Sequence, residues 1–142
     1  MVKHEQFLKL FLRIIGTAAL LAFGAVVMPY SWMNAIHQRL GMGELPSEPI
    51  VGYLARSTSM FYALFGGLLW VVSFDLYRHR PVLCYLGAVI AFFGAVLFAV
   101  DIIEGLPLYW ILFEGPVNTA FGILILALTR RLKSISNRDS LA

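Results

Sequence analysis

Long hydrophobic stretches alternate with short polar segments along the 142-residue chain. A bilayer core about 30 Å thick needs about 20 helical residues, and four stretches are that long. They are continuously apolar, which favours helices over strands. We therefore expect an all-α polytopic membrane protein, a four-helix transmembrane bundle with spans at about residues 10–29, 50–75, 82–101 and 108–129. The first stretch is long for a signal peptide, so we expect an uncleaved helix.

The segment between the first two spans has a helical pattern of its own. Apolar residues recur there at helical spacing, at Trp32, Met33, Ile36 and Leu40. This pattern predicts an amphipathic helix that lies in the membrane interface on the outer side. The sequence Gly41-Met42-Gly43 is expected to end it. It lacks the rest of a nucleotide-binding fingerprint, so a phosphate loop is excluded.

The composition supports a membrane protein and excludes several other classes. Hydrophobic residues make up 60% of the chain and charged residues 13%, whereas soluble domains average roughly 45–50% and about 25%. This excludes an ordinary soluble domain, a disordered protein and a nucleic-acid-binding domain. The expected partners are the lipid bilayer and a further copy of the chain or another membrane protein. Cys84 is the single cysteine, so an intrachain disulfide and a CxxC motif are excluded.

The basic residues indicate the orientation. One side of the predicted membrane carries nine of them, at positions 3, 9, 13, 78, 80, 130, 131, 133 and 138, and the other carries only Arg39 and Arg56. The positive-inside rule then places both termini in the cytoplasm. We expect a transmembrane domain at residues 1–132, followed by a polar cytoplasmic tail at residues 133–142, in a bacterial inner membrane.

Small residues on three of the spans predict where helices touch, because they let helix backbones approach closely in lipid. The third span carries such residues at strict four-residue steps. We expect it to contact a neighbouring helix through Gly87, Ala91, Ala95 and Ala99. Similar sets mark the second span, at Ser59, Ala63, Gly66 and Gly67, and the first, at Gly16, Ala18, Ala22 and Gly24.

Two charged residues fall inside the predicted spans and suggest a site. Arg56 lies about 27 Å from the inner end of its helix and Glu114 about 21 Å. An acid at that depth is costly unless it is neutral, paired or in a wet cavity. We expect the two side chains to pair. Asp101 is the rival partner for Arg56, and Glu114 would then need Asn118, a backbone amide or water. The predicted outward-facing polar pocket contains Arg56, Ser59, Glu114 and Asn118, with Asp101, Glu104 and His37 near its mouth.

This polar group admits other interpretations. The charged pair can be purely structural and lock two helices together. Alternatively, the fourth helix begins only after Pro116, which leaves Glu114 in the interface. Tyr30, Trp32, Tyr109 and Trp110 are interpreted as an outer aromatic belt. The outer-side acids and His37 have no metal-ligand spacing, so neither a metal nor another cofactor is expected.

Four short motifs on the predicted outer side can be compared with known kinds of protein, and together they mark a resemblance over most of residues 28–131. They are MPxxWM at 28–33, GxGELPxxPIVxYLARS at 41–57, DxxxGxP at 101–107 and EGP at 114–116. In these segments the chain resembles small four-helix membrane proteins of bacteria that have no assigned activity. The resemblance implies a bacterial inner-membrane location and no activity.

Three hypotheses for the function follow. The first is a non-enzymatic membrane protein with a structural or accessory role, favoured by small size, short loops and lack of a catalytic motif. The second is binding or transport of a small solute or ion through the outer polar pocket. The third, which the sequence favours least, is a membrane enzyme that acts at the outer surface.

Overall fold

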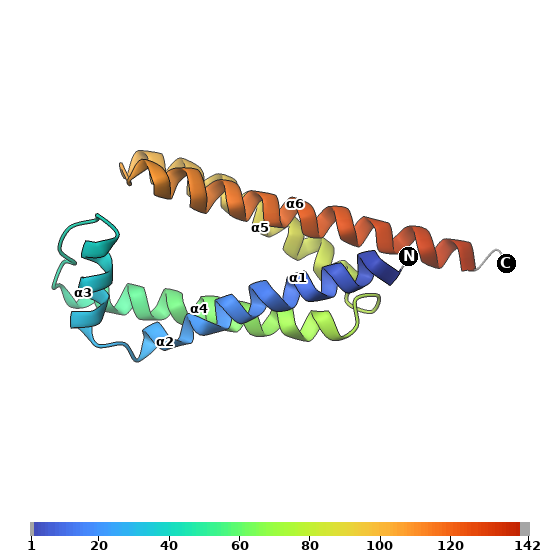
Figure 1. The fold of residues 1–142 in the computed structure, drawn as a ribbon, viewed down its shortest axis with the longest axis horizontal. Helices are drawn as coiled ribbons and strands as arrows, with labels where there is room; N and C mark the ends of the chain where they lie inside the picture. The colour runs from blue at the N-terminus through green and yellow to red at the C-terminus, as the bar shows by residue number, and fades with distance from the viewer. Residues whose placement is uncertain (1, 140–142) are drawn as a thin grey trace. The chain divides into compact units, whose positions relative to one another are not determined.

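The computed structural model describes the backbone of residues 2–139 and the side chains of residues 3–132. All regular structure in this part of the chain is helical. The elements are α1 (Val2–Leu21), α2 (Phe23–Val26), α3 (Tyr30–Arg39), α4 (Pro49–Phe74), α5 (Arg80–Ile103) and α6 (Leu108–Asp139) (Figure 1). Four segments are long and apolar enough to cross a membrane, at Lys3–Val26, Pro49–Phe74, Arg80–Ile103 and Leu108–Leu132. The predicted fold class, all-α with four membrane spans, is confirmed.

The helix boundaries follow local rules. Pro29 precedes α3, Pro49 begins α4 and Pro81 lies in the first turn of α5, where the missing N–H of proline costs nothing. Residues 2–9 are already helical, so α1 begins earlier than the predicted span, because Lys, Glu and Gln are good helix formers outside lipid too. At the other end α6 continues to Asp139, past the predicted domain limit at residue 132. Residues 140–142 of the predicted tail lie outside the described residues.

Glycines end α3 and α5 in the same way. Gly105 has φ of 68°, Leu106 N–H donates to Asp101 C=O at 3.0 Å, and Gly105 N–H donates to Ile102 C=O at 3.2 Å. This pair of bonds is a Schellman cap, which needs a residue in the left-handed conformation. Gly41, with φ of 72°, ends α3 through the equivalent bonds. The predicted end of the interfacial helix is therefore confirmed.

The chain divides into two compact units, each described by itself. The first, called here the α5–α6 unit, contains residues 2–11 and 72–139, and the second, the α1–α4 unit, is Leu12–Val71. In the α5–α6 unit the two long helices run side by side (Figure 1). Its apolar core consists of Leu8, Val72, Leu76, Leu83, Leu86, Ile125, Leu128 and Leu132. Phe11 also packs edge-to-face on Phe121, with ring centroids 5.4 Å apart.

The contact between α5 and α6 is made by small residues. A Cβ on Gly122 would overlap the backbone of Ala91, and one on Gly87 would lie 2.8 Å from the Leu126 side chain. Further along, a Cβ on Gly94 would lie 2.6 Å from Gly115 C=O. Helix backbones that approach this closely leave no room for any side chain larger than hydrogen.

Only half of the predicted small-residue stripe of the third span lies in the contact with α6. Gly87 is buried and Ala91 half-buried against α6, but Ala95 and Ala99 are exposed. Gly94 and Phe98 occupy the contact instead, Phe98 with its Cβ 2.6 Å from the position of a Cβ on Gly115. Four residues advance a helix by more than one turn, so strict four-residue steps drift off the partner. Alternating steps of four and three stay on it.

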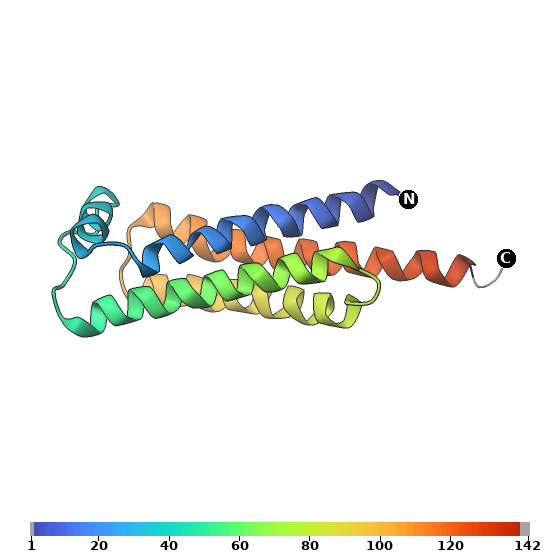
Figure 2. The same cartoon turned by 90° about the horizontal axis from the view of Figure 1, so that it is seen from below.

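The α1–α4 unit has a similar close approach. A Cβ on Gly66 of α4 would lie 2.5 Å from Gly16 C=O of α1, and one on Gly16 would lie 2.9 Å from Gly66 C=O. Figure 2 shows the two helices from a second side. Gly67 and Gly24, also expected in this contact, have nothing within 4 Å of an added Cβ. Trp70 Nε1 donates to Thr17 Oγ1 at 3.1 Å, and the Arg13 guanidinium lies 5.0 Å from the Trp70 ring centroid.

The segment from α3 to α4 is held by its own polar side chains. The Tyr30 hydroxyl donates to Leu45 C=O, and Leu45 N–H donates to Asn34 Oδ1 at 2.8 Å. Trp32, Ile36 and Leu40 form an exposed apolar stripe on α3. An exposed stripe flanked by two membrane spans is typical of an interfacial helix. The side of the membrane on which α3 lies stays a prediction.

Candidate functional site

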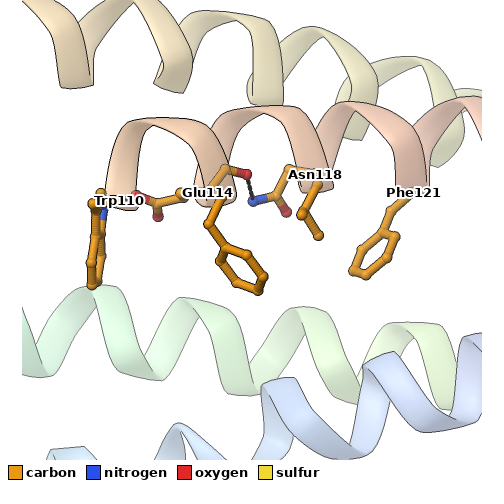
Figure 3. A pocket seen from close by; sticks show the side chains of 6 residues that line it. Trp110, Glu114, Asn118 and Phe121 are labelled. Carbon is orange, nitrogen blue, oxygen red and sulfur yellow. Dashed lines mark hydrogen bonds between the residues drawn. The ribbon is translucent and has the colours of Figure 1, made fainter. Parts of the chain in front are cut away.

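A hollow of about 380 Å³ lies along one face of α6, within its membrane span. Figure 3 shows Trp110, Glu114, Asn118 and Phe121 on this face, which points away from α5. These four residues follow one another at steps of three or four, the spacing that places side chains above one another on a helix. The complete lining is Trp110, Phe113, Glu114, Val117, Asn118 and Phe121. The hollow is therefore apolar, with two adjacent polar side chains.

Glu114 is the acidic group of this face. It lies six residues after Leu108, so about 9 Å along the helix from the start of the span. Its side chain is half-buried, and Trp110 Nε1 donates a hydrogen bond to its carboxylate oxygen Oε2. A neutral indole donor stabilises a carboxylate without neutralising its charge. The site therefore presents an acid inside an apolar span together with an aromatic ring.

Asn118 completes the polar part of the hollow. Its Nδ2 donates to the backbone carbonyl oxygen of Glu114 at 2.8 Å (Figure 3). This bond orients the amide, so its oxygen is the acceptor left on the side of the hollow. On the neighbouring face, Thr119 Oγ1 donates to Gly115 C=O at 2.9 Å. Both bonds go to carbonyls of the turn that contains Pro116, and neither reaches Leu112 C=O, which lacks its helical donor because Pro116 has no N–H.

The helix α6 is continuous through Pro116 and begins at Leu108. The alternative that the fourth helix begins only after Pro116 is therefore wrong. Pro116 removes one backbone hydrogen bond from the helix without ending it. Glu114 accordingly lies on a helix, one turn beyond Trp110 and one turn before Asn118.

Arg56 occupies a different environment in the α1–α4 unit. Its half-buried guanidinium donates to three backbone carbonyls: Nε to Val26 at 3.1 Å, Nη2 to Met28 at 3.2 Å and Nη1 to Gly52 at 3.4 Å. Val26 is the last residue of α2, and carbonyls at a helix end lack intrahelical donors. Arg56 therefore caps the end of the first span, and the partial negative charge there favours a cation.

The other predicted site residues lie in separate local environments. Ser59 Oγ donates to Ala55 C=O of its own helix at 2.7 Å, and His37 Nδ1 is 3.0 Å from Gly43 C=O. Glu104 is the exposed C-cap residue of α5. Asp101 is 3% exposed, and its Oδ2 has no hydrogen-bond partner among the described residues.

The predicted pocket draws on both units. Its members in the α1–α4 unit are His37, Arg56 and Ser59, and those in the α5–α6 unit are Asp101, Glu104, Glu114 and Asn118. Within the α5–α6 unit the structure brings Glu114 and Asn118 together. The pairing of Arg56 with Glu114 joins the two units and stays a prediction, as does the rival pairing with Asp101.

Sequence reasoning missed the role of Trp110, which it assigned to the aromatic belt. The four-residue step from Trp110 to Glu114 was the signal that could have shown the hydrogen bond. The carbonyls that Arg56 caps were also missed. Pro29 stops the first span, so the carbonyls just before it needed donors, and Arg56 was available to supply them.

The chain matches no family model, no curated protein and no solved structure. The resemblance to small bacterial membrane proteins therefore stays a prediction, and the function has to be inferred from the residues.

Proposed function

We propose that this chain is a non-enzymatic integral membrane protein with a structural or accessory role. We further propose that it resides in a bacterial inner membrane with both termini in the cytoplasm. The basic residues support this orientation, because nine of eleven lie on one side of the four spans.

One observation carries the structural role. Arg56 is the single charged residue of α4, and it donates to three backbone carbonyls of its own unit. Other polar side chains in the spans act similarly, since Ser59, Asn118 and Thr119 each donate to the carbonyl four residues earlier. A side-chain donor bonded in this way is satisfied inside its own helix, which matters in lipid because no water is present to bond it. These donor groups therefore have partners within the protein and need no substrate to satisfy them.

Membrane abundance and solute flux together test this proposal. A structural role predicts that Arg56→Gln lowers the amount of folded protein in the membrane. It also predicts that liposomes containing the purified chain show the same solute flux as empty liposomes. Exposed Glu104 supplies the control, because Glu104→Gln is expected to leave abundance unchanged. Normal abundance of Arg56→Gln combined with altered flux would contradict the proposal.

A further inference from the structure

We propose that the hollow on α6 binds an organic ammonium group, with the Glu114 carboxylate as its counter-charge and the Trp110 ring as its aromatic wall. This binding site goes beyond the accessory role and does not depend on it. The hollow is lined by Trp110, Phe113, Glu114, Val117, Asn118 and Phe121.

The charge of the site selects a cation. A carboxylate inside a membrane span is costly unless a partner offsets its charge, and the hydrogen bond from Trp110 Nε1 brings no positive charge. Arg56, the cation expected from the sequence to pair with Glu114, already donates to three carbonyl oxygens. A ligand that carries its own positive charge meets the requirement of Glu114 directly.

The hydrogen-bonding pattern of the lining points the same way. Its indole N–H is engaged by the Glu114 carboxylate, and Asn118 Nδ2 is engaged by the Glu114 carbonyl. What remains toward the hollow is a carboxylate and an amide oxygen, both acceptors (Figure 3). Acceptors complement the N–H groups of an ammonium ion and would repel an anion. An anionic ligand is therefore excluded on the chemistry of the lining.

Size separates an organic cation from a metal ion. The hollow measures about 380 Å³, at the lower end of the roughly 300–1,000 Å³ typical of small-molecule sites. Among the described residues, no three His, Cys, Asp or Glu side chains gather in a way that could hold a metal ion. Trp110, Phe113 and Phe121 instead offer the aromatic faces that attract ammonium groups. A ligand with one apolar group and one ammonium group fits this lining.

Benzylammonium is a suitable probe, and the full chain in phosphatidylglycerol nanodiscs is a suitable sample. Benzyl alcohol is the neutral match and benzoate the anionic one. Isothermal titration calorimetry is expected to show that benzylammonium binds at least about tenfold more tightly than benzyl alcohol, because only the cation pairs with the carboxylate. Benzoate is expected not to bind. Equal affinity for the cation and the alcohol would overturn the proposal, as would no binding of benzylammonium.

Variants then assign the binding to this hollow. Glu114→Gln is expected to lower the affinity for benzylammonium about tenfold, and Trp110→Phe about threefold. Glu104→Gln, which removes an exposed acid at the end of α5, is expected to leave it unchanged. Unchanged affinity in Glu114→Gln would overturn the proposal. If a melting curve shows that Glu114→Gln does not fold, Trp110→Phe and the comparison of probes on the natural chain decide.

Two further measurements identify which group supplies the positive charge opposite Glu114. Binding that is found only in Arg56→Gln would mean that Arg56 itself is the counter-charge of Glu114, and the proposal would be wrong. Nanodiscs with added phosphatidylethanolamine distinguish a lipid headgroup from a free amine. Competition by this lipid lowers the apparent affinity for the probe if the headgroup is the occupant. Unchanged affinity indicates a free amine. Both results keep the ammonium site.

Discussion

The Nε atom of Arg56 donates a hydrogen bond of 3.1 Å to the carbonyl oxygen of Val26, 30 positions earlier in the chain. This bond ties the second span to the end of the first. Arg56→Gln is expected to lower the free energy of unfolding by about 2–3 kcal/mol, because it leaves carbonyls at a helix end without donors. Denaturation of the purified protein in detergent measures the change.

The companion variants for Arg56 sharpen this prediction. Arg56→Lys keeps the charge but loses the planar set of donors, so we expect it to lie between the natural chain and Arg56→Gln. Arg39 is exposed at the end of α3, and Arg39→Gln is expected to change stability by less than about 0.5 kcal/mol. Equal stability of the Arg56 and Arg39 variants would show that the cap contributes nothing.

Adjacent glycines in α4 give a second prediction. A Cβ on Gly66 would lie 2.5 Å from Gly16 C=O and 2.8 Å from Leu20 N, whereas one on Gly67 would meet nothing within 4 Å. Gly66→Ala is therefore expected to lower the free energy of unfolding by about 1–3 kcal/mol through overpacking. Gly67→Ala is expected to be neutral or stabilising, because alanine is the better helix former. Thermal melts of both variants test the contact, and the reverse order would exclude it.

The contact between α5 and α6 supplies a third prediction. Gly94→Ala places a Cβ against Thr119 and 2.6 Å from Gly115 C=O, so we expect a clear loss of stability. Ala95 is exposed, and Ala95→Leu is expected to be tolerated by this helix pair. The four-residue pattern alone would have predicted the opposite order. Melting temperatures of the two variants in the same detergent decide which face of α5 meets α6.

The segment after α3 can be tested by proteolysis. Asn34 Oδ1 accepts from Leu45 N–H at 2.8 Å and so holds residues 40–48 near the helix. We expect Asn34→Ala to speed cleavage after Glu44 by a glutamate-specific protease several-fold, because a released segment fits a protease more easily. Gln38, exposed on the same helix, is the control position. Equal cleavage rates in Asn34→Ala and Gln38→Ala would contradict the view that the hydrogen bond to Asn34 holds this segment.

Reporter fusions test the orientation. A reporter that is active only in the periplasm should stay silent when fused after Ala142 and become active when inserted after Gly43. This result follows from the nine basic residues on the side of both termini. Activity of the fusion at the C-terminus would overturn the proposed orientation.

The spans were predictable because membrane helices need long apolar stretches, and this signal survives without any knowledge of packing. The spans predicted at residues 50–75 and 82–101 agree within two residues with α4 and α5. The contact faces were harder to predict. The strict four-residue series from Gly87 to Ala99 looked continuous, yet the contact passes through Gly94, because a helix has 3.6 residues per turn.

The candidate site was predictable only in part. Glu114 and Asn118 were expected to share a face, and the structure confirms it. The hydrogen bond from Trp110 was not expected, because an aromatic residue near the end of a span is usually an interface anchor. The role of Arg56 depends on backbone carbonyls 28 and 30 residues earlier in the chain. Pro29 marks carbonyls that need a donor, but the sequence does not show which side chain reaches them from so far along the chain.

The residues through which α5 and α6 touch are spaced in a way that determines the path of both helices. On α5 the contact passes through Gly87, Ala91, Gly94 and Phe98, and on α6 through Gly115, Thr119, Gly122 and Leu126. Each series advances through three turns by steps of four, three and four, about 3.7 residues per turn, which is slightly more than a straight helix has, so the two helices stay in register with only a slight right-handed twist. Deleting one residue between Gly115 and Gly122 would therefore rotate half of the α6 contact surface away from α5 by about 100°.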